Sequence, residues 1–289
     1  MTLNLTIVNT WGIWQCSDHR LVDTATWKLV DSYSIKHVIL RCPDGAALLA
    51  YAGAGRIGSL DLSDWIRETL RGESRTLDQS FILIRENATR DLAPLLRARG
   101  IYHMFSIGAL LAGRPWAVQI RNFTAQAGVL SGATLDHFET VAKEITDSGQ
   151  GFVFGDPHAV TRPDQEKLMT LASRKPRRPK DFRNLLASIN HRAAATPSGK
   201  RTVSPGCVTS YLPPAGEPIE CEFHDGAAAP APLVVPMLLF GIDVTEMQRT
   251  LMRQTATLRG SPGSAEASFQ QESEHAAKQA VVPRNRLRR

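Results

Sequence analysis

The 289-residue sequence predicts an α+β fold of four layers, in which two β-sheets stack face to face between outer layers of helices (αββα). The main observation is the order of segments: strands, two helices, strands, further helices and late strands. The second is the spacing of apolar residues, which cluster or alternate in some segments, as in strands, and recur every three or four residues in others, as in helices. Two stacked sheets flanked by helices would produce this order, because packed layers are the stable way to bury apolar faces.

The N-terminal sixty residues contain four short apolar segments typical of strands. They span residues 3–9, 12–17, 37–41 and 46–52. A turn is predicted at Pro43-Asp44-Gly45.

Two helices follow these strands. Trp65, Ile66 and Leu70 recur at helical steps, with Ser63 as the predicted N-cap and Gly72 as the stop. A short strand is expected at residues 81–85, before a second helix at residues 89–99.

The second half of the main domain alternates again. Strands are expected at residues 104–111, 117–122, 126–130, 207–212 and 220–223. Helices are expected at residues 135–145, 164–173 and 181–195.

The composition divides the chain into three parts. Residues 1–212 form the predicted main domain, and residues 213–258 form an extension with a linker, a strand at 234–243 and a helix at 244–254. Residues 259–289 are rich in Ser, Ala, Gln, Gly and charge, which predicts a disordered basic tail.

Composition and charge exclude several classes of function. No apolar run reaches the roughly 18–20 residues that a membrane helix needs, and no charged start precedes an apolar signal segment. The net charge of +6 arises partly from basic runs at residues 174–180 and 284–289, which we interpret as solvated surface and tail, with nucleic acid disfavoured because no aromatics interleave. Four scattered cysteines argue against zinc and disulfides, so we expect a reduced cytoplasmic protein without metal or cofactor.

The start of the chain carries the strongest chemical signal. Thr2 directly follows Met1, so removal of Met1 would make Thr2 the N-terminal residue. An N-terminal Thr combines a hydroxyl nucleophile with an α-amine that titrates near neutrality and can act as its base. A lone Thr at this position usually has no role, so the surrounding segments decide the interpretation.

The pattern around Thr2 resembles a proteasome β-type subunit. Thr2 opens an apolar strand, Gly12 lies in the hairpin turn, and Asp18-His19-Arg20 closes the second strand. The sixteen-residue step from Thr2 to Asp18 needs no gap against the family, and bacterial members with a bare Met-Thr start are most similar in layout. The resemblance covers residues 1–212 and implies the αββα fold of the N-terminal nucleophile (Ntn) hydrolases.

The resemblance implies a set of catalytic residues. Thr2 would be the nucleophile, and Lys36 would be the ammonium that lowers the pKa of the Thr2 amine, since like charges disfavour protonation. Asp18 would pair with that lysine. His37 competes with Lys36 for the position, although a neutral imidazole would not supply the charge.

Two backbone segments complete the implied site. Gly53, in an Ala-Gly segment, would direct its N–H toward the oxyanion. Ser131, in Gly128-Val-Leu-Ser131-Gly132, resembles the family's Ser-Gly segment, while its alternative role is N-cap of the helix predicted at residues 135–145.

One family feature is missing. The family has a late Asp-x-x-Ser-Gly segment that supports the Thr amine. The nearest match here is Ala195-Thr196-Pro197-Ser198-Gly199, and a second is Thr202-Val203-Ser204 after Arg201. Neither match places an aspartate at the expected position.

Three functional hypotheses follow. The first is a proteasome-like threonine peptidase or amidohydrolase that self-associates into a ring or stacked rings, with peptide substrates and an unfoldase partner implied by the resemblance. The second is a proteasome-like subunit without peptidase activity, with a scaffold role or a non-peptide amide substrate. The third, a nucleic-acid or scaffold protein acting through its basic tails, is the weakest.

Overall fold

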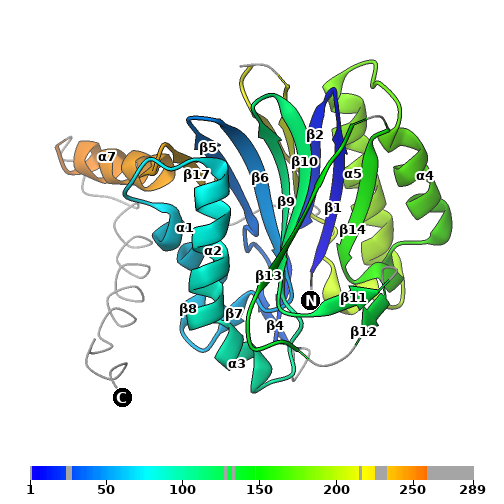
Figure 1. The fold of residues 1–289 in the computed structure, drawn as a ribbon, viewed down its shortest axis with the longest axis horizontal. Helices are drawn as coiled ribbons and strands as arrows, with labels where there is room; N and C mark the ends of the chain where they lie inside the picture. The colour runs from blue at the N-terminus through cyan, green and yellow to red at the C-terminus, as the bar shows by residue number, and fades with distance from the viewer. Residues whose placement is uncertain are drawn as a thin grey trace. The chain divides into compact units, whose positions relative to one another are not determined.

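Two large sheets stack face to face and carry helices on their outer sides (Figure 1), so the predicted α+β sandwich is confirmed. This is seen in a computed structural model of the chain. The structure describes residues 2–23, 28–126, 129–131, 134–146, 148–214, 217–224 and 233–258.

The five-stranded sheet carries the N-terminus of the described chain. Its order is β14-β1-β2-β15-β16, and all neighbours are antiparallel. The strands are β1 (Leu3–Asn9), β2 (Gly12–Asp18), β14 (Gln150–Gly155), β15 (Cys207–Leu212) and β16 (Glu220–His224). β14 was not predicted, whereas the other four strands were.

The seven-stranded sheet has the order β13-β10-β9-β6-β5-β17-β18. Its strands are β5 (His37–Cys42), β6 (Gly45–Ala52), β9 (Met104–Leu111), β10 (Arg114–Arg121), β13 (Glu139–Glu144), β17 (Met237–Leu239) and β18 (Ile242–Asp243). β17 pairs in parallel with β5, so a strand from the predicted extension joins this sheet. The single strand expected at residues 234–243 is two short strands.

Three short two-stranded sheets connect the larger elements. They pair β3 (Leu21–Val22) with β4 (Leu29–Asp31), β7 (Arg56–Ile57) with β8 (Leu60–Asp61), and β11 (Thr124–Gln126) with β12 (Val129–Ser131). The strand predicted at residues 126–130 is therefore two strands of a hairpin.

Helices cover the outer face of each large sheet (Figure 1). The seven-stranded sheet packs under α1 (Leu62–Leu70), α2 (Leu77–Asp91) and α3 (Ala93–Arg97). The five-stranded sheet packs under α4 (Arg162–Ala172) and α5 (Pro179–Ala195). Shorter pieces are a 3₁₀ turn (Pro157–Ala159) and α6 (Gly199–Thr202), and α7 (Val244–Leu258) comes last.

The side-chain alternation of β1 separates two environments. Leu3, Leu5 and Ile7 belong to the apolar cluster beneath α4 and α5. Asn4 and Thr6 point the other way, because successive strand residues face opposite sides. There Asn4 Nδ2 donates to Tyr51 O of β6 at 2.8 Å, and Gln15 Nε2 donates to Ser106 O of β9 at 3.2 Å. Polar contacts therefore join the two sheets near the start of β1.

Two sequence predictions about α1 and α2 were wrong. Residues 81–85 are not a strand but part of α2, which a capping box of Thr76 and Gln79 begins. Phe81, Ile84 and Ala88 are buried at helical spacing, so α2 was visible in the pattern. Asp61, not Ser63, is the N-cap of α1, because its side chain accepts from two backbone N–H groups of the first turn.

The helix predicted at residues 135–145 is wrong as well. β13 occupies Glu139–Glu144 and pairs with β10 from Trp116↔Glu144 to Arg121↔Glu139. This segment is mostly exposed at the sheet edge, so its apolar residues do not form the buried helical face that the prediction required. Pairing with β10 decides the conformation, because tertiary contacts override local helix propensity.

The chain divides into two compact units, residues 1–245 and 246–289. In the second unit, the structure describes the part of α7 that ends at Leu258, where Glu246 lies 4.0 Å from both Arg249 and Arg253. The helix predicted at residues 244–254 is confirmed, while the domain boundaries at 212 and 258 stay predictions. The predicted tail lies outside the described residues.

Candidate active site

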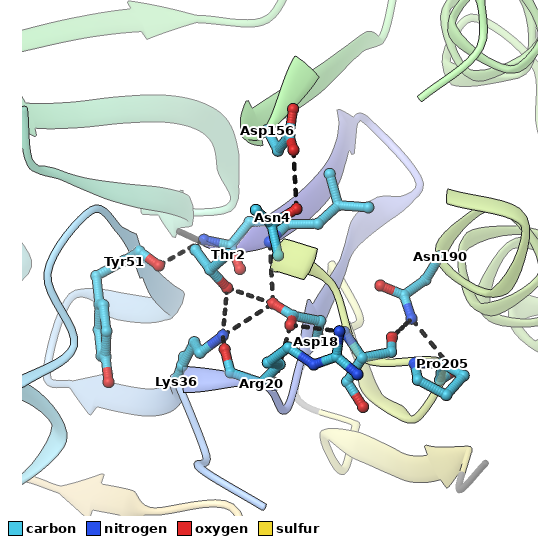
Figure 2. Close-up of polar contacts among 12 residues, drawn as sticks. Thr2, Asn4, Asp18, Arg20, Lys36, Tyr51, Asp156, Asn190 and Pro205 are labelled. Atoms are coloured by element: carbon cyan, nitrogen blue, oxygen red, sulfur yellow. Dashed lines mark hydrogen bonds and ion pairs between the residues drawn. The ribbon is translucent and has the colours of Figure 1, made fainter. Parts of the chain in front are cut away.

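Thr2 lies immediately before β1, at the end of the five-stranded sheet, and its side chain is 2% exposed. Its hydroxyl donates to Asp18 Oδ1 and accepts from Lys36 Nζ at 2.6 Å (Figure 2). The β1–β2 hairpin explains the first contact, because the pairing Asn4↔Ser17 sets the start of β1 against the end of β2. The structure therefore brings Thr2, Asp18 and Lys36 together.

The Asp18 carboxylate is buried and accepts five hydrogen bonds. Oδ1 accepts from Thr2 Oγ1, Leu3 N and Lys36 Nζ. Oδ2 accepts from Arg20 N at 3.0 Å and Ser204 N at 3.1 Å. Burial would raise the pKa of the Asp18 carboxyl, but the Lys36 charge and these hydrogen bonds outweigh burial and lower that pKa. Asp18 is therefore an ionised carboxylate at neutral pH.

Lys36 directly precedes β5, and its ammonium group is 1% exposed. Nζ donates to Thr2 Oγ1, to Asp18 Oδ1 at 2.9 Å and to Arg20 O, so each of its three protons has an acceptor. Burial lowers the pKa of Lys36, and the negative charge of Asp18 offsets part of that effect. A positive charge thus lies directly against the Thr2 hydroxyl.

His37, the competing residue, occupies a different place. It is the first residue of β5, pairs with Ala50 of β6 and is fully buried. Burial lowers the pKa of its imidazole to about 3, so the ring is neutral at physiological pH. The structure brings Lys36, and not His37, to the Thr2 hydroxyl.

Gly53 follows β6 with a φ of 116°, a conformation that favours glycine. A Cβ at this position would collide with Tyr102 O and would lie 2.9 Å from His103 Nδ1. The Asn4–Tyr51 hydrogen bond joins the preceding residues of β6 to β1, two residues after Thr2 (Figure 2). The backbone here requires glycine, and the oxyanion role of Gly53 stays a prediction.

Ser131 is the last residue of β12 and pairs with Thr124 of β11. Its alternative role as a helix N-cap is wrong, because β13 occupies the segment where the helix was expected. Gly128 and Gly132 lie outside the described residues, and the Ser131 side chain is not described. A role for Ser131 beside Thr2 stays a prediction.

A second carboxylate residue, Asp156, lies beside Thr2 and was not predicted from the sequence. Asp156, which is labelled in Figure 2, follows β14 and is 3% exposed, and its backbone N–H donates to Thr2 O at 3.0 Å. Its Oδ2 accepts from Ser198 Oγ and Thr202 Oγ1, which belong to the two late segments that lack the family's aspartate. The available signal was the apolar run Phe152-Val153-Phe154 followed by Gly155-Asp156-Pro157, a strand and then a turn.

Other kinds of site find no support in the part of the chain that the structure describes. It contains no group of three or more His, Cys, Asp and Glu side chains that could hold a metal ion. None of its helices combines the length and the apolar character needed to cross a membrane. All four cysteines are free thiols.

Comparison with solved structures identifies the fold as the proteasome-β-like fold of the Ntn hydrolases. Several of the matching structures are of Anbu, described as an ancestral β-subunit. The Gly-1 mutant from Hyphomicrobium sp. strain MC1 is similar over 92% of this chain and 100% of its own, with a TM-score of 0.51 and 15% identity.

Two further Anbu structures match at 12% identity with TM-scores of 0.50. The match to the protein from Yersinia bercovieri spans 91% of this chain and 99% of the Yersinia protein. The match to a chain in the helical assembly of the Anbu complex from Pseudomonas aeruginosa spans 90% of this chain and 99% of the Pseudomonas chain. No family model and no curated protein sequence matches this chain. At these identities the likeness establishes the fold.

Lys36→Met tests the buried ion pair. We expect it to lower the free energy of unfolding by about 3–5 kcal/mol at pH 7, because Asp18 would remain as a buried unpaired charge. In the wild type, the stabilisation from the lowered pKa of Asp18 is present above its unfolded pKa and is lost as the pH falls through its folded pKa. In the variant, the Lys36 charge no longer opposes the effect of burial, so the pKa of Asp18 is higher than in the wild type, acid relieves the penalty, and the difference in unfolding free energy should shrink toward pH 4.

Urea unfolding at both pH values measures this difference. Lys167→Met, on an exposed face of α4, is the control and should stay within about 0.5 kcal/mol of wild type. If the difference in unfolding free energy between the wild type and Lys36→Met were the same at both pH values, the argument from the buried charge would be contradicted.

Gly155→Ala tests the close approach of β14 to Thr2. Gly155 has a φ of 99°, and a Cβ there would collide with Thr2 O. We expect a loss of at least about 1 kcal/mol in unfolding free energy and a displaced Thr2. Gly113→Ala is the matched control, because Gly113 also has a positive φ, of 77°, but no atom lies within 4 Å of the added Cβ. Thermal unfolding should separate the two variants, because only Gly155→Ala adds a collision, and equal losses of stability would contradict the steric argument.

Proposed function

We propose that this protein is a threonine-type amide hydrolase, a proteasome-like peptidase or amidohydrolase, whose nucleophile is Thr2 after removal of Met1. One observation carries the proposal: the Thr2 hydroxyl lies between the buried ammonium of Lys36 and the buried carboxylate of Asp18. A hydroxyl held between an ammonium and a carboxylate suits nucleophilic catalysis, because both groups fix its direction and the charges stabilise its polarisation.

In the proposed first step, Thr2 Oγ1 attacks the carbonyl carbon of an amide, and the Thr2 amine accepts the hydroxyl proton. The Lys36 charge favours the free-amine form of that base. The Gly53 N–H would stabilise the oxyanion of the tetrahedral intermediate. The C–N bond then breaks, the leaving amine takes the proton from the Thr2 ammonium, and an ester to Thr2 remains.

Water resolves the ester in the second step. The Thr2 amine accepts a proton from the attacking water, a second tetrahedral intermediate forms, and the C–O bond to Thr2 breaks as the proton returns to Oγ1. Asp18 need not change protonation in either step. Its five hydrogen bonds keep Lys36 and the backbone of Leu3 in place around the nucleophile.

A subunit without peptidase activity is the second candidate. The observation that favours it is the lack of an aspartate in both late segments that resemble the family's: Ala195 stands at that position in the first segment and Arg201 in the second. Under this alternative the fold and its assembly would persist without a reactive Thr2.

An epoxyketone probe distinguishes the two candidates, because it needs both the hydroxyl and the free amine of an N-terminal Thr. We expect the intact mass of the wild-type protein to show loss of Met1 and one adduct. Thr2→Ala should give no adduct, whereas Thr10→Ala, in the exposed turn after β1, should react like wild type. Retained Met1, or lost Met1 without an adduct, would favour the inactive subunit.

We also propose that the chain self-associates. Support comes from the helical assembly formed by the Anbu complex from Pseudomonas aeruginosa, to which this fold is similar. A ring is the arrangement that the sequence resemblance implies, and it would enclose the Thr2 sites in a chamber.

Light scattering at micromolar concentration tests this proposal. We expect a particle mass that is a multiple of the chain mass and does not change on mild dilution. A monomer at that concentration would rule out a stable ring or helical assembly.

A further inference from the structure

Asp156 is a buried carboxylate that lies beside Thr2 but has no part in the Thr2–Lys36–Asp18 contacts. Its backbone N–H donates to Thr2 O, and the preceding Gly155 approaches that carbonyl too closely to allow a side chain. The residue therefore sits directly against the backbone of the nucleophile. A carboxylate with 3% exposure is unusual, because burial of an ionised group is costly unless hydrogen bonds or charges compensate.

The compensation comes from hydroxyl and backbone donors. Oδ2 accepts from Ser198 Oγ at 2.6 Å and from Thr202 Oγ1 at 2.8 Å, and Oδ1 accepts from His158 N at 3.1 Å. Among the residues that the structure describes, no lysine, arginine or histidine side chain forms an ion pair with the Asp156 carboxylate. Its carboxylate is therefore held in one orientation by neutral donors and keeps capacity for a positive partner.

We propose that Asp156, oriented by Ser198 and Thr202, positions the amine that Thr2 acquires when Met1 is removed. The inference deepens the proposed function, because it requires Thr2 to be the N-terminal residue. It also departs from the family pattern, in which the late Asp-x-x-Ser-Gly segment supplies the carboxylate. Here the serine of that segment, Ser198, receives its carboxylate from a residue 42 positions earlier.

Several charged groups lie around Thr2. Lys36 and Asp18 contact the hydroxyl. Arg20, whose backbone O accepts from Lys36, places a positive charge near that lysine, and Asp31 acts on the lysine with the opposite sign. Asp156 lies on the side of the Thr2 backbone. Positive charges favour the free amine, whereas a carboxylate favours the ammonium, so loss of the Asp156 charge should lower the pKa of the Thr2 amine.

The test uses residues 2–289 released from a cleavable N-terminal fusion, so that Thr2 is the first residue whether or not Met1 is normally removed. Acetic anhydride at limiting amount reacts only with free amines, and mass spectrometry of the peptide ending at Arg20 reports the acetylated fraction of Thr2 from pH 5 to 10. We compare wild type with Asp156→Asn, which keeps the shape and a hydrogen-bond acceptor. The matched control is Asp164→Asn, a carboxylate of α4 that is 8% exposed and bonded to Arg192.

We expect Asp156→Asn to move the midpoint of acetylation to lower pH by about one unit, because an opposite charge at close range shifts a pKa by about 1–3 units. At a fixed pH below both midpoints this means about tenfold faster acetylation. Asp164→Asn should leave the midpoint at the wild-type value.

A purely structural role for Asp156 predicts something else. The thermal midpoint of Asp156→Asn would fall while the acetylation midpoint stayed at the wild-type pH, and that result would overturn the inference. Ser198→Ala, which leaves the carboxylate in place, gives a second check and should produce a smaller shift in the same direction.

The epoxyketone reaction keeps the two proposals apart. If wild-type protein forms no adduct, the proposed function fails, yet the acetylation midpoints still decide whether Asp156 acts on the amine. If the adduct forms, Asp156→Asn should label at least about tenfold more slowly even above the amine pKa, where positioning and not protonation limits the rate.

Discussion

The interaction on which the site depends is the buried ion pair between Lys36 and Asp18. Removing two charges from water costs several kcal/mol per ion, and only close geometry with further hydrogen bonds repays that cost. Here the ammonium has three acceptors and the carboxylate five donors. Those partners come from β1, β2, the segment before β5 and the turn before β15, so the pair forms only when both sheets are correctly paired.

Much of the fold could be predicted from local sequence, because its strands are short, apolar and bounded by clear turns. β1, β9 and β15 match their predicted limits, and the hairpin of β1 and β2 makes the sixteen-residue step from Thr2 to Asp18 a spatial contact. The segments at 81–85 and 135–145 failed for a different reason. The first segment is too short to show its period and belongs to a longer helix that Thr76 caps, whereas the second forms a strand because it pairs with the edge of β10.

The residues of the candidate site also differ in how far the local sequence could predict their positions. Lys36 and His37 are neighbours, and the sequence could not choose between them, because the choice depends on which side chain the entry to β5 directs toward Thr2. The place of Asp156 could not be predicted because β14 pairs with β1, and about half of the chain separates the two strands. The only local sign, a turn after an apolar run, says nothing about which strand lies beside it.

The lack of one motif residue in the sequence is therefore only weak evidence that the site is inactive. The exposed Ala195 argues against a supported Thr2 amine only if the supporting carboxylate must come from the same segment. The chemistry requires a charge at a certain point in space, whichever part of the chain supplies it. Here Asp156, which follows β14, accepts a hydrogen bond from the serine of that segment, Ser198. Lys36 contacts the Thr2 hydroxyl, and Asp156 contacts the Thr2 backbone. Under the role that we propose for Asp156, a change in either charge would shift the pKa of the Thr2 amine. We therefore infer that a strand distant in the sequence can supply a charge that a local motif lacks.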